Sequence, residues 1–279
     1  MSAHDATRRN GDERFLLTLW TDDPELAARA DAAGIDRIGL DLEREGKRER
    51  QAGLGTWISP HTVERLPVVR EALTRAQLFA RVNPLSPATA GELDCLLSEG
   101  VEVLMLPMFE SAEQVSSFIE VVDGRAEIVL LLETEAAMRD VERIVEVPGV
   151  REIHVGINDL ALSLGMRNRF EVLDCAPVEH MSACVLAAGL RFGIGGIGRI
   201  GDLGLPIPPE LIYAQYPRLG ATAALVSRTF LRTADGPLQM HAEVTRSREC
   251  MTRWWDAGPT ELEHARTRLR QALDRCGDW

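Results

Sequence analysis

The sequence has little cysteine, few aromatic residues and no long apolar run. Only 5 of its 279 residues are cysteine, and none of these forms a C-x-x-C pair, which is the spacing of many redox and zinc motifs. An odd number of cysteines without paired spacing predicts ordinary thiols in a reducing compartment. No apolar stretch approaches the roughly 18 residues of a membrane span. We therefore expect a cytoplasmic protein.

Positive charge is also scarce. The net charge of −12 argues against a nucleic-acid binder, because affinity for phosphate backbones depends on clustered lysine and arginine. It leaves open a small anionic substrate, which responds to local charge. Residues 1–13 lack the apolar core of a secretory signal, so we predict a disordered leader there.

What the sequence does contain is a repeated alternation of short apolar runs with helical patterns. Several runs are apolar on both faces, which is typical of parallel strands covered by helices. An open doubly wound sheet produces a similar alternation, but eight units in a chain of this length favour closure into a (β/α)8 TIM barrel. The eight predicted strands are 14–20, 36–42, 76–82, 101–107, 127–133, 152–158, 190–196 and 223–229.

Two segments interrupt the alternation. Residues 43–75 form a long insertion after the second strand, charged at first and then helical, and such loops on a barrel's C-terminal face often carry function. The residues from 237 onward have helical patterns beyond the last strand. We predict one barrel domain over 14–236 and a C-terminal helical extension over 237–279. A neighbouring subunit is one candidate for covering Trp254 and Trp255 in that extension.

Polar residues at the ends of the predicted strands supply the candidate site, because the C-terminal ends of barrel strands meet on one face. Glu133 and Asp159 end neighbouring strands, and two close carboxylates repel unless a cation lies between them. Their oxygen ligands suit Mg²⁺, with Mn²⁺ or Co²⁺ as alternatives. The competing interpretation is that each acid caps the following helix. The other strand-end candidates are Asp41, Glu43, Arg81, Pro107, Gly195 and Gly196.

Three further features bear on binding and proton transfer. The Arg81 guanidinium suits a carboxylate or phosphate, although a buried ion pair with Glu43 or another acid is the alternative. The run GIGGIG at 193–198 matches a dinucleotide pattern but lacks the helix that must follow. It favours a glycine-rich, anion-binding loop after the seventh strand, or simple tight turns. Among the histidines, His61 lies in the insertion, whereas His154 is expected inside the sixth strand as a core or outer-face residue.

At these residues the sequence resembles the HpcH/HpaI aldolase and citrate lyase β-subunit family of pyruvate-type barrels. The resemblance extends over about residues 36–232. The motifs that carry it are LDLE (40–43), ARVN (80–83), VLMLPMFESAEQV (103–115), LLET (131–134), PGV (148–150) and GINDLALSLG (156–165).

The resemblance implies roles for three of the candidate residues. Glu133 and Asp159 correspond to the divalent-metal ligands, and Arg81 to the arginine that binds the 2-oxo acid. It also implies a homo-oligomer, a trimer or hexamer, with the C-terminal helices between subunits. Aldolases of the family have a histidine after the acid of the second-strand motif, where this chain has Arg44. Glu43, His61 or a metal-bound water is then the candidate for proton transfer.

Three functions remain open on the sequence. The first is a metal-dependent carbon–carbon lyase that acts on a 2-oxo acid such as pyruvate, with an aldehyde or acyl acceptor, through an enolate. The second is a β-hydroxyacyl-CoA lyase or hydrolase, for which Lys47, Arg48 and Arg50 are the candidates to bind the CoA phosphates. The third, suggested by Arg44, is a barrel that has lost its chemistry and serves as a scaffold subunit.

Overall fold

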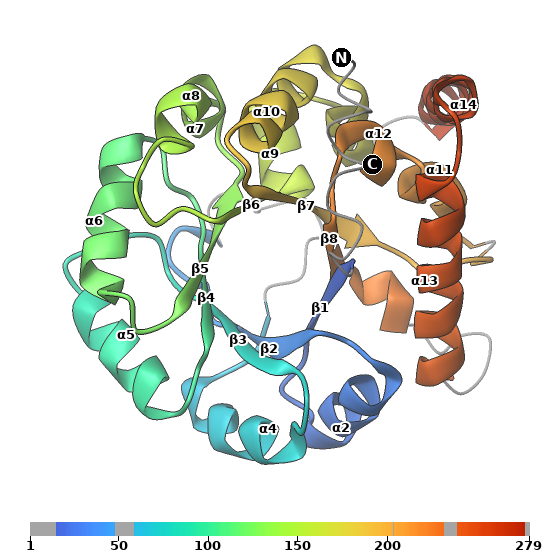
Figure 1. Cartoon of the computed structure of the whole chain (residues 1–279). Helices are drawn as coiled ribbons and strands as arrows, with labels where there is room; N and C mark the ends of the chain where they lie inside the picture. Colours follow the sequence, from blue (N-terminus) through green and yellow to red (C-terminus); the bar gives the residue numbers. More distant parts are fainter. Residues whose placement is uncertain (1–14, 48–58, 203, 232–238, 277–279) are drawn as a thin grey trace.

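Eight parallel strands close into a barrel in sequence order, which confirms the predicted (β/α)8 fold (Figure 1). The computed structural model describes residues 15–47, 59–202, 204–231 and 239–276. Each strand overlaps one of the predicted ranges. The strands are β1 (Leu16–Trp20), β2 (Arg37–Asp41), β3 (Gln77–Arg81), β4 (Val103–Leu106), β5 (Glu127–Leu132), β6 (Glu152–Val155), β7 (Arg191–Ile197) and β8 (Ala223–Val226).

Helices surround the strands as an outer layer (Figure 1). No helix among the described residues is long and apolar enough to cross a membrane. The helices before β5 are α2 (Pro24–Ala33), η1 (Val63–Arg65), α4 (Leu66–Ala72), α5 (Thr89–Ser98) and α6 (Ala112–Val122). Those up to β7 are α7 (Glu135–Arg139), α8 (Val141–Ile144), α9 (Ile157–Ser163), η2 (Arg169–Asp174) and α10 (Ala176–Ala187). The remainder are α11 (Pro209–Tyr213), α12 (Gln215–Leu219), η3 (Arg228–Leu231), α13 (Met240–Trp255) and α14 (Pro259–Cys276).

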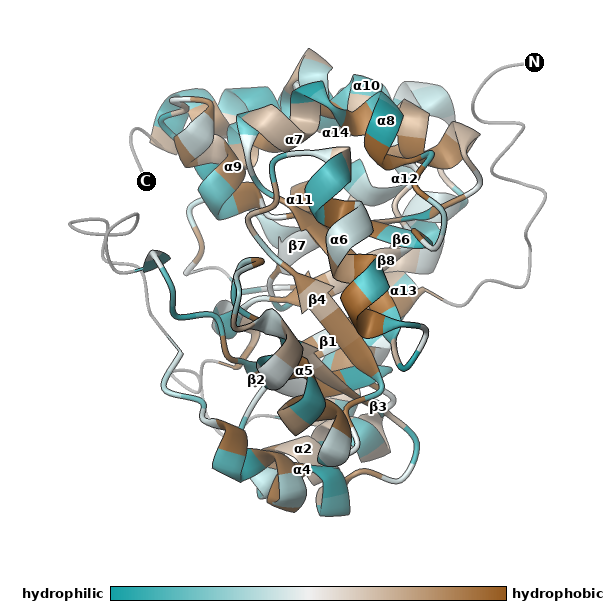
Figure 2. Cartoon of the chain, turned by 90° about the vertical axis from the view of Figure 1, so that its left-hand side faces the viewer, coloured by the Kyte–Doolittle hydropathy of each residue, from teal (hydrophilic) through white to brown (hydrophobic). Residues whose placement is uncertain are grey.

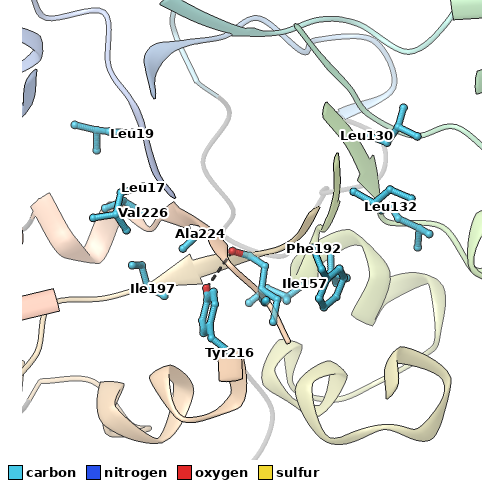
Figure 3. Packing of buried hydrophobic residues seen from close by; sticks show 14 of the residues in the cluster. Leu17, Leu19, Leu130, Leu132, Ile157, Phe192, Ile197, Tyr216, Ala224 and Val226 are labelled. Atoms are coloured by element: carbon cyan, nitrogen blue, oxygen red, sulfur yellow. Dashed lines mark hydrogen bonds between the residues drawn. The ribbon is translucent and has the colours of Figure 1, made fainter. Parts of the chain in front are cut away.

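Apolar side chains pack on both faces of the strands, because successive residues point alternately into and out of the barrel. Outward-facing residues such as Leu17, Leu130 and Phe192 pack beneath the helices (Figure 3). In the same layer, the Tyr216 hydroxyl donates to the backbone oxygen of Ile194. The brown colour along β4 in Figure 2 agrees with a strand that is buried on both faces.

The barrel interior is filled by a separate apolar cluster rather than by a channel. This cluster comprises Phe79, Val103, Met105, Val129 and Leu131. The ring of Trp20, from the end of β1, stacks on Phe79 with 4.8 Å between ring centroids. The packed interior separates the two ends of the barrel, so polar groups at the C-terminal ends of the strands form a mouth of their own.

The opposite end of the barrel holds a buried ion network. Arg37 Nη1 donates to Glu152 Oε1 at 2.7 Å, and His154 Nε2 lies 2.6 Å from the same oxygen. His154 is buried, which agrees with the core alternative. A Cβ on Gly193 would lie 2.3 Å from His154 Nε2, so a glycine in β7 leaves room for the ring. Residues 193–197 of the GIGGIG run lie within β7, so the prediction that this run forms a loop after the strand is wrong.

The two C-terminal helices pack on the barrel's outer layer. Arg248 of α13 donates to the backbone oxygens of Phe15 and Gly34, at 2.7 and 2.6 Å, which ties α13 to the region of β1 and α2. Trp254 is buried within this chain, so its burial needs no neighbouring subunit. The predicted subunit contact stays a prediction, as does the boundary at 236. The predicted leader lies outside the described residues.

Candidate active site

Asp41 and Arg81 form the first part of the site at the ends of two neighbouring strands. They are register partners in the β2–β3 pairing. Arg81 Nε donates to Asp41 Oδ1 at 2.8 Å, and Nη2 donates to Oδ2 at 2.7 Å. Arg81 Nη1 also lies 3.3 Å from Glu43 Oε2. The ion-pair alternative considered for Arg81 is therefore present, and it fixes the guanidinium in a bidentate geometry.

Lys47 completes this cluster. Its Nζ lies 2.9 Å from Asp41 Oδ2 and 3.1 Å from Glu43 Oε2, and the residue is buried. An ammonium group held in this way cannot belong to a basic surface for CoA phosphates, so that prediction is wrong for Lys47. The other two residues proposed for that surface, Arg48 and Arg50, lie outside the described residues.

The pairing controls the charge state of both partners. Burial by itself raises the pKa of Asp41, but the charges and hydrogen bonds of Arg81 and Lys47 outweigh it and hold this pKa well below its usual range. Burial likewise lowers the pKa of Arg81, but Asp41 and Glu43 raise it above its ordinary value. Both groups are therefore charged at neutral pH, despite their burial.

Glu133 follows β5 and is 2% exposed. The backbone N–H of Met108 donates to its Oε1 at 3.1 Å. A Cβ on Gly156 would lie 2.6 Å from its Oε2. The neighbouring Thr134 caps α7 by accepting the N–H of Ala137. The capping interpretation therefore fails for Glu133, and its carboxylate points toward the barrel mouth instead.

The charges around Glu133 are unfavourable for a carboxylate. Burial raises its pKa well above the ordinary value, the charges of Glu43 and Asp159 raise it further, and the charge of Arg81 opposes them. A cation close to Glu133 would lower this pKa and favour the ionised carboxylate.

Asp159 lies in the first turn of α9 and not at the end of a strand. The predicted strand 152–158 stops at Val155, and α9 begins at Ile157. The prediction failed here because a short apolar run fits a strand and a buried helix equally well. The residue is 8% exposed, and its charge reaches Glu133. The two predicted metal ligands are therefore close enough for the charge of one to act on the other.

His61 lies beside the cluster on the segment before η1. Its Nδ1 accepts the backbone N–H of Asp41 at 3.1 Å, and its Nε2 lies 3.7 Å from Asp22 Oδ1. Burial lowers the pKa of His61, although the charges of Asp22 and Asp41 oppose this. The neutral ring therefore carries its proton on Nε2 and has no lone pair left for a substrate proton. Arg44 Nη2 donates to the His61 backbone oxygen at 2.6 Å, so Arg44 supports this segment.

The remaining predicted residues shape the mouth. Asn83 Oδ1 accepts the backbone N–H groups of Arg44 and Glu45, at 2.8 and 3.1 Å, so this side chain holds the segment after β2 against the end of β3. Pro107 is buried directly after β4. Gly195 and Gly196 lie in β7. Substrate contact by these last three residues stays a prediction.

Sequence reasoning missed three parts of the site: the buried pairing of Lys47, the Met108 N–H and the close approach of Gly156. The spacing of four residues between Glu43 and Lys47 is a signal for an ion pair. The position of Met108, with φ of +54°, carries no signal in its residue type, because methionine rarely adopts the left-handed region.

A second group with metal-ligand chemistry lies on the outer helices. His180 and Cys184 are four residues apart on α10, and Glu142 is on α8. His180 Nε2 lies 3.3 Å from Glu142 Oε1 and 3.6 Å from Cys184 Sγ. The Cys184 sulfur and the His180 nitrogen make this group chemically distinct from the carboxylates at the barrel mouth.

Comparison with known proteins agrees with the arrangement. The family model for HpcH/HpaI aldolase/citrate lyase matches residues 14–199. A hydroxypyruvate/pyruvate aldolase from Agrobacterium fabrum (strain C58 / ATCC 33970) is 26% identical over 211 residues, covering 64% of this chain and 74% of that protein.

Solved structures share the fold. An HpcH/HpaI aldolase/citrate lyase family protein from Burkholderia cenocepacia J2315 superposes with a TM-score of 0.62 at 18% identity, covering 82% of this chain and 95% of that one. An HpcH/HpaI aldolase from Desulfitobacterium hafniense DCB-2 gives a TM-score of 0.58 at 15% identity, covering 90% and 97%. The chain belongs to the HpcH/HpaI aldolase/citrate lyase family, and it is a lyase-type enzyme built on a (β/α)8 barrel.

Proposed function

We propose that the chain is a divalent-metal-dependent carbon–carbon lyase of the aldolase type. It would form or cleave the bond next to a 2-oxo acid such as pyruvate, through an enolate. The observation that carries the proposal is the distribution of charge at the barrel mouth. Asp41 and Glu43 are paired with Arg81 and Lys47, whereas the charges of Glu43 and Asp159 both act unfavourably on Glu133.

The residues at the mouth fit a hard divalent cation. Glu133 and Asp159 offer carboxylate oxygens, and Gly156 leaves the space against Glu133 that a side chain would fill. Mg²⁺, or Mn²⁺ or Co²⁺ in its place, would be held by these two acids. When bound, the metal supplies positive charge that stabilises the negative charge developing on the 2-oxo acid as it becomes an enolate.

Arg81 is the residue proposed to hold the carboxylate of the 2-oxo acid. A guanidinium has five N–H donors, and the bidentate pairing with Asp41 uses one on Nε and one on Nη2. Nη1 also lies 3.3 Å from Glu43 Oε2, so one N–H donor on each terminal nitrogen remains for a second carboxylate. Because Asp41 fixes the plane of the guanidinium, the substrate would be oriented before the reaction begins.

The substrate class has support from the Agrobacterium relative, which is named for activity on hydroxypyruvate and pyruvate. The acyl-CoA alternative is weaker, because Lys47 is buried and paired. The scaffold alternative is also weaker, because a barrel without chemistry gains nothing from burying Glu133 among other acids. A small-molecule 2-oxo acid and an aldehyde are thus the proposed reactants.

The test is exchange of the pyruvate methyl protons in D₂O, followed by NMR, with Mg²⁺ or Mn²⁺ and with EDTA. Exchange should require metal and should fall roughly 100-fold or more in Glu133→Gln and in Asp159→Asn. Glu120→Gln, which removes an exposed carboxylate on α6, is the matched control and should exchange normally. Metal-independent exchange, or normal exchange in both site variants, would contradict the proposal.

A further inference from the structure

A histidine, a cysteine and a glutamate meet on two outer helices, apart from the residues of the proposed active site. His180 and Cys184 are on α10, and Glu142 is on α8. The two helices pack against each other and are neighbours in both views (Figure 1 and Figure 2). Each residue offers one ligand atom, and the three atoms all lie within 4.8 Å of one another. A ring nitrogen, a sulfur and a carboxylate oxygen are the atoms by which proteins bind zinc.

The helix spacing explains why the two ligands of α10 converge. Residues four apart lie one turn above each other on the same face of a helix, so His180 and Cys184 share a face. The buried face of the same helix, which includes Met181 and Val185, anchors it to the core. Glu142 reaches this face from the exposed side of α8. The backbone positions of the three residues are therefore set by packing, and only their side chains face solvent.

The distances between the ligand atoms match those around a tetrahedral ion. His180 Nε2 lies 3.3 Å from Glu142 Oε1 and 3.6 Å from Cys184 Sγ. A zinc ion about 2.0 to 2.3 Å from each ligand atom keeps neighbouring ligands about 3.3 to 3.8 Å apart. Both distances from the histidine nitrogen fall within this range. The oxygen and the sulfur are no more than 4.8 Å apart, a separation that a small rotation of the exposed glutamate side chain can close.

An ordinary surface ion pair explains only part of this arrangement. The ring nitrogen of His180 carries at most one proton, so it cannot align well with the Glu142 oxygen and the Cys184 sulfur at once. The adjacent cation, Arg143, donates to Asp140 and Glu113. A metal ion on the lone pair of the same nitrogen would contact both the oxygen and the sulfur.

We propose that Glu142, His180 and Cys184 bind one Zn²⁺ ion, with water as the fourth ligand. The sulfur and nitrogen ligands favour Zn²⁺ over Mg²⁺. The side chains of Glu142 and His180 are 75% and 61% exposed, which leaves one side of the ion open to water. Because the folded chain brings α8 and α10 together, the ion would bind the folded state and stabilise it. This site goes beyond the proposed function, since no step of the lyase reaction uses it.

The test is a Zn²⁺ titration of reduced, EDTA-stripped protein in competition with a chromophoric zinc chelator, with millimolar Mg²⁺ present to occupy the mouth carboxylates. Wild type should bind one Zn²⁺ that Mg²⁺ does not displace. Cys184→Ser and His180→Ala should each weaken binding by at least about 100-fold, because the loss of an outer-shell partner already costs about 10-fold to 100-fold. His264→Ala on α14 and Cys95→Ser on α5, both at exposed positions, are the controls and should keep wild-type affinity.

Thermal unfolding gives a second measurement. Zn²⁺ should raise the Tm of wild type and of Glu133→Gln, which lacks a mouth carboxylate, but not that of Cys184→Ser. If Cys184→Ser binds Zn²⁺ as tightly as wild type, the three residues make surface contacts only, and the inference is overturned. It is equally overturned if Glu133→Gln loses the tightly bound Zn²⁺, because the ion would then lie at the barrel mouth. Neither measurement uses pyruvate, so a failed exchange assay would count against the proposed function alone.

Discussion

Gly156 lies directly against the carboxylate of Glu133. A Cβ at position 156 would come within 2.6 Å of Oε2 and 2.9 Å of the Glu133 Cβ. Such distances are too short for any side chain, so the residue after β6 determines where the Glu133 carboxylate lies. The proposed metal site thus depends on the absence of a side chain as much as on the two acids.

Gly156→Ala should therefore displace Glu133 without unfolding the barrel. We expect the Mg²⁺ dependence of pyruvate exchange to move to much higher metal concentration, with a fall in rate of roughly 10-fold to 100-fold. Gly91→Ala on α5 is the matched control, since a Cβ there meets nothing within 4 Å and alanine favours a helix. Equal metal titration curves for the two variants would contradict the prediction.

The Asp41–Arg81 pair should contribute far more to stability than a surface pair of similar length. Asp41→Asn leaves Arg81 and Lys47 with one fewer anion in a buried site, and we expect the free energy of unfolding to fall by about 3 kcal/mol. Asp94→Asn breaks a 2.6 Å pair with Arg125, in which Asp94 is 67% exposed. Its expected cost is below about 0.5 kcal/mol. Urea unfolding of both variants measures the difference. Similar losses in the free energy of unfolding would contradict the prediction.

The sequence predicted the barrel well because apolar runs report burial directly. Runs such as 127–133 are apolar on both faces, as a parallel strand covered by helices requires. Strand ends were harder to predict. At 152–158 the apolar pattern continues from β6 into α9, so Asp159 was placed at a strand end rather than in a helical turn. Likewise, the run GIGGIG at 193–198 was also read as a loop after the seventh strand, although the predicted strand 190–196 overlaps it and Gly193 is needed inside β7 beside His154.

Side-chain pairing was predictable only in outline. Arg81 and Glu43 were recognised as possible ion-pair partners, because both follow apolar strands. Lys47 was assigned to the surface, since the charged stretch that contains it resembles a solvated loop. Its burial also depends on the contact with Asp41, and no local pattern encodes that contact.

Acid should weaken the fold through the network at the other end of the barrel. Burial raises the pKa of Glu152, but the His154 hydrogen bond and the Arg37 charge outweigh it and lower this pKa to about 2. Because the folded-state pKa lies below the ordinary value of 4.5, the stabilisation is present above pH 4.5 and is lost as the pH falls toward 2. Its size is on the order of 3 kcal/mol.

Glu152→Gln should remove this part of the pH dependence. The variant should be less stable than wild type at pH 7, and the two stability curves should converge below pH 4. Urea unfolding between pH 2.5 and pH 7 measures both effects. An unchanged slope in Glu152→Gln would show that other carboxylates govern acid unfolding.

Metal titrations should separate two sites with different chemistry. The carboxylates Glu133 and Asp159 favour Mg²⁺, whereas a histidine and a thiol favour Zn²⁺ or Co²⁺ over Mg²⁺. The distances from His180 Nε2 to Glu142 Oε1 and Cys184 Sγ, 3.3 and 3.6 Å, are close to the edges of a zinc tetrahedron, which are about 3.4 and 3.6 Å for ordinary zinc–ligand bonds.

Co²⁺ added to reduced protein should therefore give a thiolate-to-cobalt charge-transfer band that Mg²⁺ does not abolish. Cys184→Ser should eliminate this band, and Cys95→Ser, which removes an exposed thiol on α5, should retain it. Pyruvate exchange should be unaffected in both variants, because neither cysteine lies at the barrel mouth. A band that survives in Cys184→Ser would assign the cobalt to other ligands, and the outer helices would then hold no metal.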